Sequence, residues 1–508
     1  MAKRSEFPPI CVALGCTDGD QLEKLARAAC DAGEQFLEIR MDMLGEPRQA
    51  LAVMRRVKDR HPEVVVLATC RRKQNGGKFM GSVEEQLQLL EAAVEASAQA
   101  VDIEIETAAV ACQRLAGWRE RAKVVVSYHN FQSTPALEPV LRKLDKAPAD
   151  VYKLVTMARK PSDNYRILEL ARRARGRPLV VLAMGEVGIP SRVLSLSRHC
   201  LFTYAAPPTC GGANPRPAPT APGQVSSSLM RRQYRADRHT VETEIYGVIA
   251  NPVVHSISPA VHNRAFQARR IDAVYLPFLV EERCLADFFT LVEKLPLAGF
   301  SVTIPHKQKV LRHLDGIDLP AQRIGAVNTV YRRKGRLRGT NTDAAGVTAP
   351  LEKRLKLKNA KVLIAGTGGG ARAAAFALAD RGAQVWITGR NPDRARALAR
   401  LCGAEALDRS RVAGRRFDVL VHATRLGMHP RVDESFFTDE IPAELVFDMV
   451  YNPLETRLLK MARAAGKSVI SGLEMFLEQA AAQFEIWTGT TAPRLAMETI
   501  AREALESL

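Results

Sequence analysis

Residues 123–129, KVVVSYH, and residues 151–157, VYKLVTM, are two of eight short β-branched or apolar runs in the first 205 positions. Helical stretches rich in Ala, Leu, Arg and Glu separate the runs, which recur about every 25 residues. This alternation is typical of a parallel sheet, and eight units predict a (β/α)8 barrel. The other six runs are PICVALG (9–15), FLEIRM (36–41), VVVLATC (64–70), VDIEIE (101–106), PLVVLAM (178–184) and CLFTY (200–204).

Residues 206–243 are rich in Pro, Gly, Ser and Arg, which predicts a loop over the barrel mouth followed by a linker. The strand and helix alternation then resumes and includes a predicted hairpin over 328–343, NTVYRRKGRLRGTNTD. The alternation of strands and helices starts again at 361–372, KVLIAGTGGGAR. This strand, glycine-rich turn and helix predict a dinucleotide-binding unit. The pattern predicts a barrel (1–225), a linker (226–243), an α/β substrate domain (244–345), a Rossmann domain (346–470) and C-terminal helices that pack back on the substrate domain (471–508).

The composition is that of an ordinary globular protein, with 46% hydrophobic and 25% charged residues. The longest apolar runs fall short of the roughly 20 residues of a membrane span, and the N-terminus resembles no targeting peptide, so we expect a cytoplasmic protein. The nine cysteines include no C-x-x-C pair, and we expect neither disulfides nor a metal site. The net charge of +18 is spread along helices, so anionic small substrates are expected rather than nucleic acid.

Lys153 shares a strand face with Val151 and Val155, which in a barrel is the interior or the mouth. Burial favours the neutral amine of a lysine, which can attack a ketone and form a Schiff base. A lysine held by a carboxylate is the structural alternative. His129 ends the fifth run, where it is placed to move a proton next to such an imine; a hydrogen-bonded core histidine is the alternative.

Arginines end two further strands of the predicted barrel. Glu38 and Arg40 share one face at the end of the second strand, and Arg71 follows the third. Arginines in such places suit a carboxylate substrate, although salt bridges between neighbouring barrel strands are a common alternative.

About residues 8–225 resemble the class I (Schiff-base) 3-dehydroquinate dehydratases. The segments EIRMD (38–42), TCR (69–71), NGG (75–77), VDIEIE, SYHNF (127–131), YKLVTMA (152–158), MGEVGIPSR (184–192) and TAPGQ (220–224) occur in the family's order. The resemblance implies that Lys153 forms the imine and that His129 moves the proton and assists loss of the hydroxyl. It implies that substrate is held by Arg192, Glu38, Arg40, Arg71, Thr220 and Gln224.

Asn75 departs from this family, which usually has a glutamate four residues after the arginine of the third strand. That carboxylate usually orients and charges the histidine, so an amide there is expected to lower the basicity of His129. We therefore expect a slower but working dehydratase.

The glycine-rich turn after strand 361–365 opens a helix, so its backbone amides can bind a pyrophosphate. About 20 residues on, the second strand ends in Arg390 rather than in an acidic residue, which predicts NADPH. Arg390, helped by Arg394, is expected to bind the 2′-phosphate; an arginine exposed there by chance is the alternative.

Lys307 and Asp343 lie in predicted loops, where functional groups concentrate. Such a pair can share a proton and stabilise the alkoxide during ketone reduction, or it can be a structural salt bridge. Ser256 and Ser258 are two residues apart and would share one face of an extended segment, with hydroxyls suited to a polyol or carboxylate. Ser and Pro together also mark ordinary turns.

Residues 245–489 resemble shikimate dehydrogenases. The motifs are YGVIANPVVHSISPAVHN (246–263), SVTIPHK (301–307), GAVNT (325–329), GTNTD (339–343), GTGGGAR (366–372), HATRLGM (422–428), DMVYNP (448–453) and GLEMFLEQAAAQFEIWTG (472–489). The resemblance implies that Lys307 and Asp343 are catalytic. It places Ser256, Ser258, Thr303, Asn328, Tyr451 and Gln479 at the shikimate, and Gly366, Gly368, Gly369, Gly370, Arg390, Arg394, Thr424 and Gly472 at NADP.

The two resemblances imply consecutive reactions of the shikimate pathway, since 3-dehydroshikimate leaves the first and enters the second. The expected partners are the small molecules 3-dehydroquinate, 3-dehydroshikimate and shikimate; the oligomeric state is open. One alternative is a quinate or shikimate dehydrogenase with an impaired dehydratase half, supported by Asn75. The other is a ligand-sensing regulator without catalysis.

Overall fold

A computed structural model describes residues 7–208, 219–438 and 440–506, and it divides into two compact units. The first contains the residues up to Thr243 together with Phe278–Pro296, and the second contains Glu244–Pro277 and the residues from Leu297 onward. Ten residues of the predicted loop over the barrel mouth, 209–218, lie outside the described residues. The five domain boundaries given above stay predictions.

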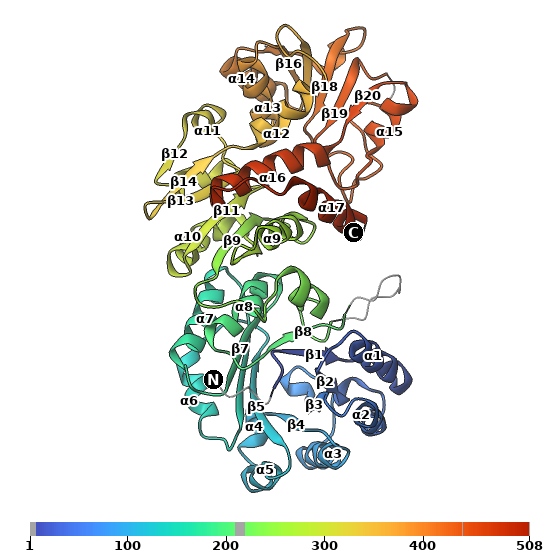
Figure 1. Ribbon diagram of the computed structural model, residues 1–508, viewed down its shortest axis with the longest axis vertical. Helices are drawn as coiled ribbons and strands as arrows, with labels where there is room; N and C mark the ends of the chain where they lie inside the picture. Colours follow the sequence, from blue (N-terminus) through green and yellow to red (C-terminus); the bar gives the residue numbers. More distant parts are fainter. Residues whose placement is uncertain (1–6, 209–218, 439, 507–508) are drawn as a thin grey trace. The chain divides into compact units, whose positions relative to one another are not determined.

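The first unit confirms the predicted barrel. Its eight parallel strands follow the order β7-β6-β5-β4-β3-β2-β1-β8 (Figure 1). The barrel is nearly closed, because the Leu201 N–H, just before β8, donates to the Leu179 carbonyl of β7 at 2.9 Å. The strands are β1 (Ile10–Leu14), β2 (Phe36–Arg40), β3 (Val65–Thr69), β4 (Ala100–Glu104), β5 (Lys123–Asn130), β6 (Val151–Met157), β7 (Leu179–Met184) and β8 (Thr203–Ala205). The helices are α1 (Gly19–Asp31), α2 (Gln49–Arg60), α3 (Val83–Glu95), α4 (Ile105–Ala108), α5 (Cys112–Trp118), α6 (Leu137–Leu144), α7 (Ser162–Arg173), α8 (Ile189–Leu194) and α10 (Leu285–Lys294).

The barrel interior is built in layers, because alternate residues of a strand point inward and every second strand contributes to one layer. The even-numbered strands contribute a buried apolar layer that consists of Phe36, Ala100, Val151 and Phe202. Two residues further along the same strands, the layer becomes polar and consists of Glu38, Asp102, Lys153 and Tyr204. The chemistry-bearing groups therefore lie inside the barrel on a packed apolar floor.

The second unit begins with a mixed six-stranded sheet of order β10-β9-β11-β13-β14-β12, in which β13 and β14 form the predicted hairpin. Its strands are β9 (Glu244–Ala250), β10 (Ala273–Leu279), β11 (Leu297–Val302), β12 (Gly316–Ile317), β13 (Thr329–Arg333) and β14 (Arg336–Thr340). The helices of this part are α9 (Ser258–Arg269), α11 (Leu319–Ile324) and α12 (Asp343–Glu352).

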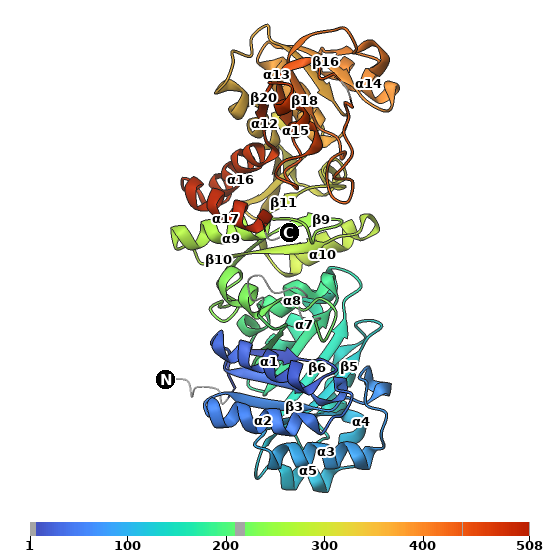
Figure 2. The same ribbon diagram turned by 90° about the vertical axis from the view of Figure 1, so that its right-hand side faces the viewer.

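A parallel six-stranded sheet of order β17-β16-β15-β18-β19-β20 follows, which confirms the predicted Rossmann-like architecture. Its strands are β15 (Lys361–Ala365), β16 (Gln384–Thr388), β17 (Glu405–Ala406), β18 (Phe417–His422), β19 (Ala443–Asp448) and β20 (Ser468–Ile470), with helices α13 (Gly369–Asp380), α14 (Pro392–Cys402) and α15 (Arg457–Ala464). Apolar side chains of α12 and α13 pack on one face of this sheet. Figure 2 shows the two helices beside the sheet.

Two helices, α16 (Gly472–Thr488) and α17 (Arg494–Glu506), complete the second unit. The α16 residues bond back to the first sheet of the unit: the Gln483 Nε2 donates to the Asn328 carbonyl at 3.1 Å, and the Trp487 indole donates to the Val330 carbonyl at 3.0 Å. The C-terminal helix thereby joins residues about 150 positions apart in the sequence.

Of the two interpretations left open for Ser256 and Ser258, the structure supports the turn, because neither serine lies in an extended segment. Ser256 follows a turn and Ser258 is the first residue of α9, and the Ser258 N–H donates to the Ser256 Oγ at 3.3 Å. Pro259 explains the difference, since its fixed φ and missing N–H suit the first turn of a helix. Within the described parts of the chain, no helix has the length and hydropathy that crossing a bilayer requires.

Candidate active sites

Lys153 lies in the polar layer of the barrel, and its side chain is almost entirely buried. Its Nζ lies 2.9 Å from the Asp102 Oδ2, 2.8 Å from the Tyr204 hydroxyl and 3.6 Å from the Glu38 Oε1. The amine is therefore held from three sides in the interior of the barrel, where a ketone bound at the mouth can meet it.

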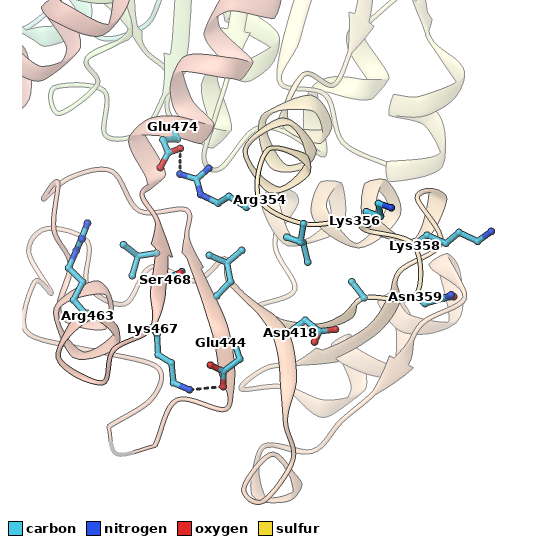
Figure 3. Close-up of a pocket in the computed structure, with 14 residues that line it drawn as sticks. Arg354, Lys356, Lys358, Asn359, Asp418, Glu444, Arg463, Lys467, Ser468 and Glu474 are labelled. Atoms are coloured by element: carbon cyan, nitrogen blue, oxygen red, sulfur yellow. Dashed lines mark hydrogen bonds and ion pairs between the residues drawn. The ribbon is translucent and has the colours of Figure 1, made fainter.

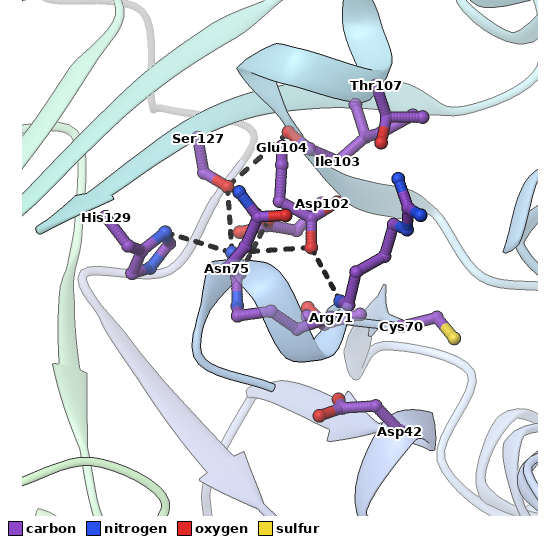
Figure 4. A network of polar contacts seen from close by, with 12 residues as sticks. Asp42, Cys70, Arg71, Asn75, Asp102, Ile103, Glu104, Thr107, Ser127 and His129 are labelled. Carbon is purple, nitrogen blue, oxygen red and sulfur yellow. Dashed lines mark hydrogen bonds and ion pairs between the residues drawn. The ribbon is translucent and has the colours of Figure 1, made fainter. Parts of the chain in front are cut away.

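Arg71 connects this layer to His129 (Figure 4). One guanidinium nitrogen donates to the Asp102 Oδ1 at 2.8 Å, and the other lies 2.9 Å from the His129 Nδ1. The Ser127 Oγ donates to the same Asp102 oxygen at 2.7 Å. Because an arginine can only donate, the Nδ1 of His129 is the acceptor in this contact.

The charges around this network decide the protonation of its members. Burial first, and then the positive charges of Arg71 and Lys153, lower the pKa of His129 well below its ordinary value. Burial disfavours the ionised carboxylate of Asp102, but Arg71 and Lys153 outweigh this effect and hold its pKa well below its usual range. At neutral pH the layer thus contains an ionised Asp102 and a neutral His129, which has the protonation state of a base.

The predicted substrate groups of the barrel form two sets. Glu38 and Arg71 lie beside Lys153, whereas Arg40 is engaged by Asp42 through two hydrogen bonds of 2.9 Å. The second set, Arg192, Thr220 and Gln224, follows β7 in the sequence. The Thr220 Oγ1 donates to the Gln224 Oε1 at 3.1 Å, and Arg192 donates to the Pro222 carbonyl at 3.2 Å.

Arg192 is a buried cation whose charge is not compensated by a described carboxylate. It is 1% exposed, and burial alone lowers the pKa of its guanidinium to about 10. Its Nε is buried and has no hydrogen-bond partner among the described residues. A buried, uncompensated guanidinium is costly, and a substrate carboxylate would supply the missing charge and the missing bond.

Among the residues that the structure describes, Asn75 forms no hydrogen bond with His129. Its amide donates to the Glu106 Oε2 at 2.9 Å. The single exchange Asn75→Glu would place a second carboxylate next to that of Glu106. It would therefore add repulsion between the two carboxylates as well as a charge near the site. The sequence-based account of Asn75 did not include this neighbour.

The exchange Asn75→Glu combined with Glu106→Gln is expected to raise dehydratase turnover and to move the acid limb of its pH profile upward by about one unit. A carboxylate near His129 favours the charged imidazole and therefore raises the pKa of His129. Because a base works above its pKa, the acid limb of the pH profile moves upward with it. The measurement is the rate of enone formation between pH 4 and 9. The Glu106→Gln protein is the control, and a double variant with the control's rate and profile would contradict this role of position 75.

The second unit brings the predicted catalytic pair together. The Lys307 Nζ forms an ion pair with the Asp343 Oδ2, and the Asn328 Nδ2 donates to the other carboxylate oxygen at 2.7 Å. Asn328 also donates to the Gln479 Oε1 at 3.4 Å, which links the pair to α16. Lys307 keeps part of its side chain exposed, so an incoming ligand can reach the amine.

For two of the remaining predicted shikimate groups, the structure gives contacts or positions of their own. Thr303 directly follows β11, and the ring centroids of Tyr451 and Phe476 are 5.0 Å apart. Burial raises the pKa of Tyr451 to about 12, so its phenol is a neutral hydrogen-bonding group at ordinary pH. Behind them runs a buried chain that the sequence did not reveal: the Tyr275 hydroxyl donates to the Ser301 Oγ at 2.6 Å, which donates to the Gln483 Oε1 at 2.9 Å.

The glycine-rich turn has the shape that a pyrophosphate needs. Gly366 has φ +135°, and a Cβ there would lie 2.6 Å from the Ala423 carbonyl oxygen, so no other residue fits. Gly368 is the N-cap of α13, and Gly369 and Gly370 form its first turn with N–H groups free of the helix ladder. A Cβ on Gly369 would lie 3.2 Å from the Lys307 side chain, so the turn and the catalytic lysine are neighbours.

Four further residues predicted at the cofactor lie after β16, in α14, after β18 and at the start of α16. Arg390 and Arg394 are exposed, and neither side chain forms a salt bridge with the residues that the structure describes. Thr424 lies beside a buried pair the sequence did not identify: its Oγ1 is 2.6 Å from the His422 Nε2, and the His422 Nδ1 is 2.9 Å from the Asp448 Oδ1. Gly472 lies against Val450, where a Cβ would approach the carbonyl carbon to 2.4 Å.

A cavity of about 950 Å³ lies at the other end of the Rossmann sheet (Figure 3). It is lined by Asp418, Glu444 and Ser468 at the starts of their strands, whereas nucleotides bind at the carboxyl ends of such sheets. Four of its charged side chains form two ion pairs within the cavity wall, Arg354 with Glu474 and Lys467 with Glu444. The cavity takes no part in the sites above, and in the described chain no group of three His, Cys, Asp or Glu side chains is placed to bind a metal.

A barrel with a buried lysine, followed by a unit that joins a Lys–Asp pair to a Rossmann-like sheet, is typical of a lyase fused to a dehydrogenase. The family model for type I 3-dehydroquinase matches residues 10–240. Those for the shikimate dehydrogenase substrate-binding domain, shikimate/quinate 5-dehydrogenase and the shikimate 5′-dehydrogenase C-terminal domain match 248–330, 350–449 and 472–502.

Similar proteins agree with both halves. The chain is 33% identical to the chloroplastic bifunctional 3-dehydroquinate dehydratase/shikimate dehydrogenase of Arabidopsis thaliana, over 96% of this chain and 83% of that protein. It is 42% identical to a shikimate dehydrogenase (NADP(+)) of Methanosarcina acetivorans, over 52% of this chain and 99% of that protein. A crystal structure of a shikimate dehydrogenase with NADP+ is 34% identical, with a TM-score of 0.50, covering 53% of this chain and 97% of that one. The chain belongs to the bifunctional 3-dehydroquinate dehydratase/shikimate dehydrogenase family.

Proposed function

We propose that the barrel unit dehydrates 3-dehydroquinate to 3-dehydroshikimate through an imine on Lys153, and that the second unit reduces this product to shikimate with NADPH. The observation that carries the proposal is the pair of assembled centres: a buried amine beside a neutral histidine, and a Lys–Asp pair beside a glycine-rich turn. The enzyme is a lyase and an oxidoreductase of the pathway that leads to chorismate and the aromatic amino acids.

In the barrel, the nitrogen of Lys153 attacks the substrate ketone, and the resulting iminium acidifies the neighbouring C–H. His129 removes that proton because its lowered pKa keeps it unprotonated, and returns a proton to the departing hydroxyl. Arg192 holds the carboxylate, since burial leaves its charge uncompensated. Glu38, Thr220 and Gln224 are proposed to bind the hydroxyls.

In the second unit, Lys307 and Asp343 hold and transfer the proton that the carbonyl oxygen gains during reduction. Asn328 fixes the carboxylate through its 2.7 Å hydrogen bond. Ser256, Ser258, Thr303, Tyr451 and Gln479 are proposed to bind shikimate. The glycines at 366 and 368–370, with Thr424 and Gly472, would hold NADP, which supplies the hydride when bound.

Arg390→Ala is expected to lower catalytic efficiency with NADPH by about 10- to 100-fold and to leave that with NADH nearly unchanged, because only NADPH carries the 2′-phosphate. Steady-state rates with both cofactors measure the effect. The control is Arg400→Ala, which removes another exposed arginine of the same region. Equal efficiency of the unaltered protein with the two cofactors would contradict the assignment.

The alternative of a quinate or shikimate dehydrogenase with an impaired barrel rested on Asn75 and is not favoured, because the type I 3-dehydroquinase model and a bifunctional relative both cover the barrel half. A regulator without catalysis is not favoured, because Lys153, His129, Lys307 and Asp343 are all present in assembled sites. A cytoplasmic location and the absence of metal, nucleic-acid and membrane partners stay predictions.

The test supplies purified protein with 3-dehydroquinate alone, follows the ultraviolet absorbance of the conjugated product, and then adds NADPH and follows its oxidation. Both signals are expected. Oxidation of NADPH with supplied 3-dehydroshikimate, but no enone from 3-dehydroquinate, would favour the impaired-barrel alternative. The absence of both signals would overturn the proposed function.

A further inference from the structure

Tyr204 is the fourth member of the polar layer around Lys153, and the proposed function leaves it without a task. Its hydroxyl lies 2.8 Å from the Lys153 Nζ, closer than any other oxygen that the structure describes there. It reaches the amine from β8, whereas the two carboxylates come from β2 and β4. The reacting nitrogen thus contacts two acidic oxygens and one phenol.

The phenol differs from the carboxylates in what it can donate. Burial first, and then the negative charge of Glu38, raise the pKa of Tyr204 well above its ordinary value, so the hydroxyl keeps its proton. Asp102 is ionised and only accepts hydrogen bonds. Tyr204 is therefore the partner of the Lys153 nitrogen that can accept a proton and donate one at the same time.

The position of this hydroxyl is fixed by packing. Tyr204 is 4% exposed, pairs with Cys11 across the β1–β8 ladder, and meets the Phe202 ring edge-on with centroids 5.6 Å apart. The Lys153 amine also lies 3.9 Å from the centre of the tyrosine ring. A group held this firmly pays little reorganisation cost when it takes part in a reaction.

Addition of an amine to a ketone requires one proton to move from nitrogen to oxygen. Direct transfer passes through a strained four-membered ring, whereas a hydroxyl bonded to the nitrogen opens a six-membered path. We propose that Tyr204 is a catalytic residue of the dehydratase and relays this proton. The N–C bond forms, the C=O π bond breaks, the Lys153 nitrogen loses a proton to the Tyr204 oxygen, and the Tyr204 proton passes to the former carbonyl oxygen. The phenol is neutral before and after.

The relay rests on Lys153 being the imine-forming residue, and the test separates the two claims. Full-length protein is mixed with 3-dehydroquinate in a single turnover and quenched at increasing times into borohydride, which reduces the imine to a stable amine seen by intact mass. In Tyr204→Phe, imine formation is expected to slow by about 100-fold, the scale of positioned proton transfer. A rate equal to that of the unaltered protein would overturn the relay alone, whereas no adduct on the unaltered protein would overturn both claims.

Tyr152→Phe is the matched control. Tyr152 neighbours Lys153 in the chain, but its hydroxyl donates to the Ala147 carbonyl at 3.3 Å and not to the amine. Its trapping rate is expected to stay within about twofold of the parent rate. If Tyr204→Phe does not fold, 3-fluorotyrosine at position 204 keeps the shape and changes only the acidity of the phenol. A changed trapping rate supports the relay, and an unchanged rate overturns it.

Discussion

Lys153→Arg is expected to lower dehydratase turnover by at least about 10⁴-fold, while reduction of supplied 3-dehydroshikimate continues at the parent rate. Arginine keeps a positive charge next to Asp102 and Glu38, so the buried carboxylates remain compensated. A guanidinium stays protonated and forms no imine with a ketone. The loss is therefore chemical rather than a failure to fold.

Enone formation and borohydride trapping measure this effect on one preparation. Lys153→Met is the companion variant: it removes the charge as well, and is expected to lose activity and also stability of the barrel, because Asp102 and Glu38 lose a buried partner. Among the described side chains of the polar layer, Lys153 carries the only amine that could form an imine. If Lys153→Arg keeps more than about one hundredth of the parent turnover, the reaction does not use an imine there, and Lys153 is a structural cation.

Asp343→Asn is expected to lower the turnover of 3-dehydroshikimate reduction by about 10²- to 10⁴-fold, with a smaller change in KM. The amide keeps the shape of the side chain and can still bond Asn328, but it cannot share a proton with Lys307. Dehydration in the barrel provides the internal measure of protein quality.

Asp380→Asn is the matched control for the loss of an ion pair, because Asp380 pairs with Arg323 at 2.8 Å on the surface of the same unit. Exposed pairs contribute little, so this variant is expected to reduce substrate at a rate within about twofold of the parent. If Asp343→Asn behaves like Asp380→Asn, the Lys307–Asp343 contact is structural and the proton comes from another group.

Most of the fold followed from local patterns. Eight apolar runs corresponded to eight strands, and the glycine-rich turn after 361–365 corresponded to the start of α13. These predictions succeed because strand alternation and glycine conformations are decided within a few residues. The choice between an extended segment and a turn at Ser256 and Ser258 was local as well, since Pro259 suits the first turn of a helix.

The sequence by itself determined the architecture and the family, and it predicted which lysines, histidine and arginines carry the chemistry. Only the tertiary structure decided what surrounds them: Asp102 and Tyr204, each 51 residues from Lys153, meet its amine, and Asn75 meets Glu106. Alternation along a strand shows which residues point inward, but the closure and stagger of the barrel decide which of them share a layer. That choice depends on all eight strands at once, and no single stretch of the chain contains it.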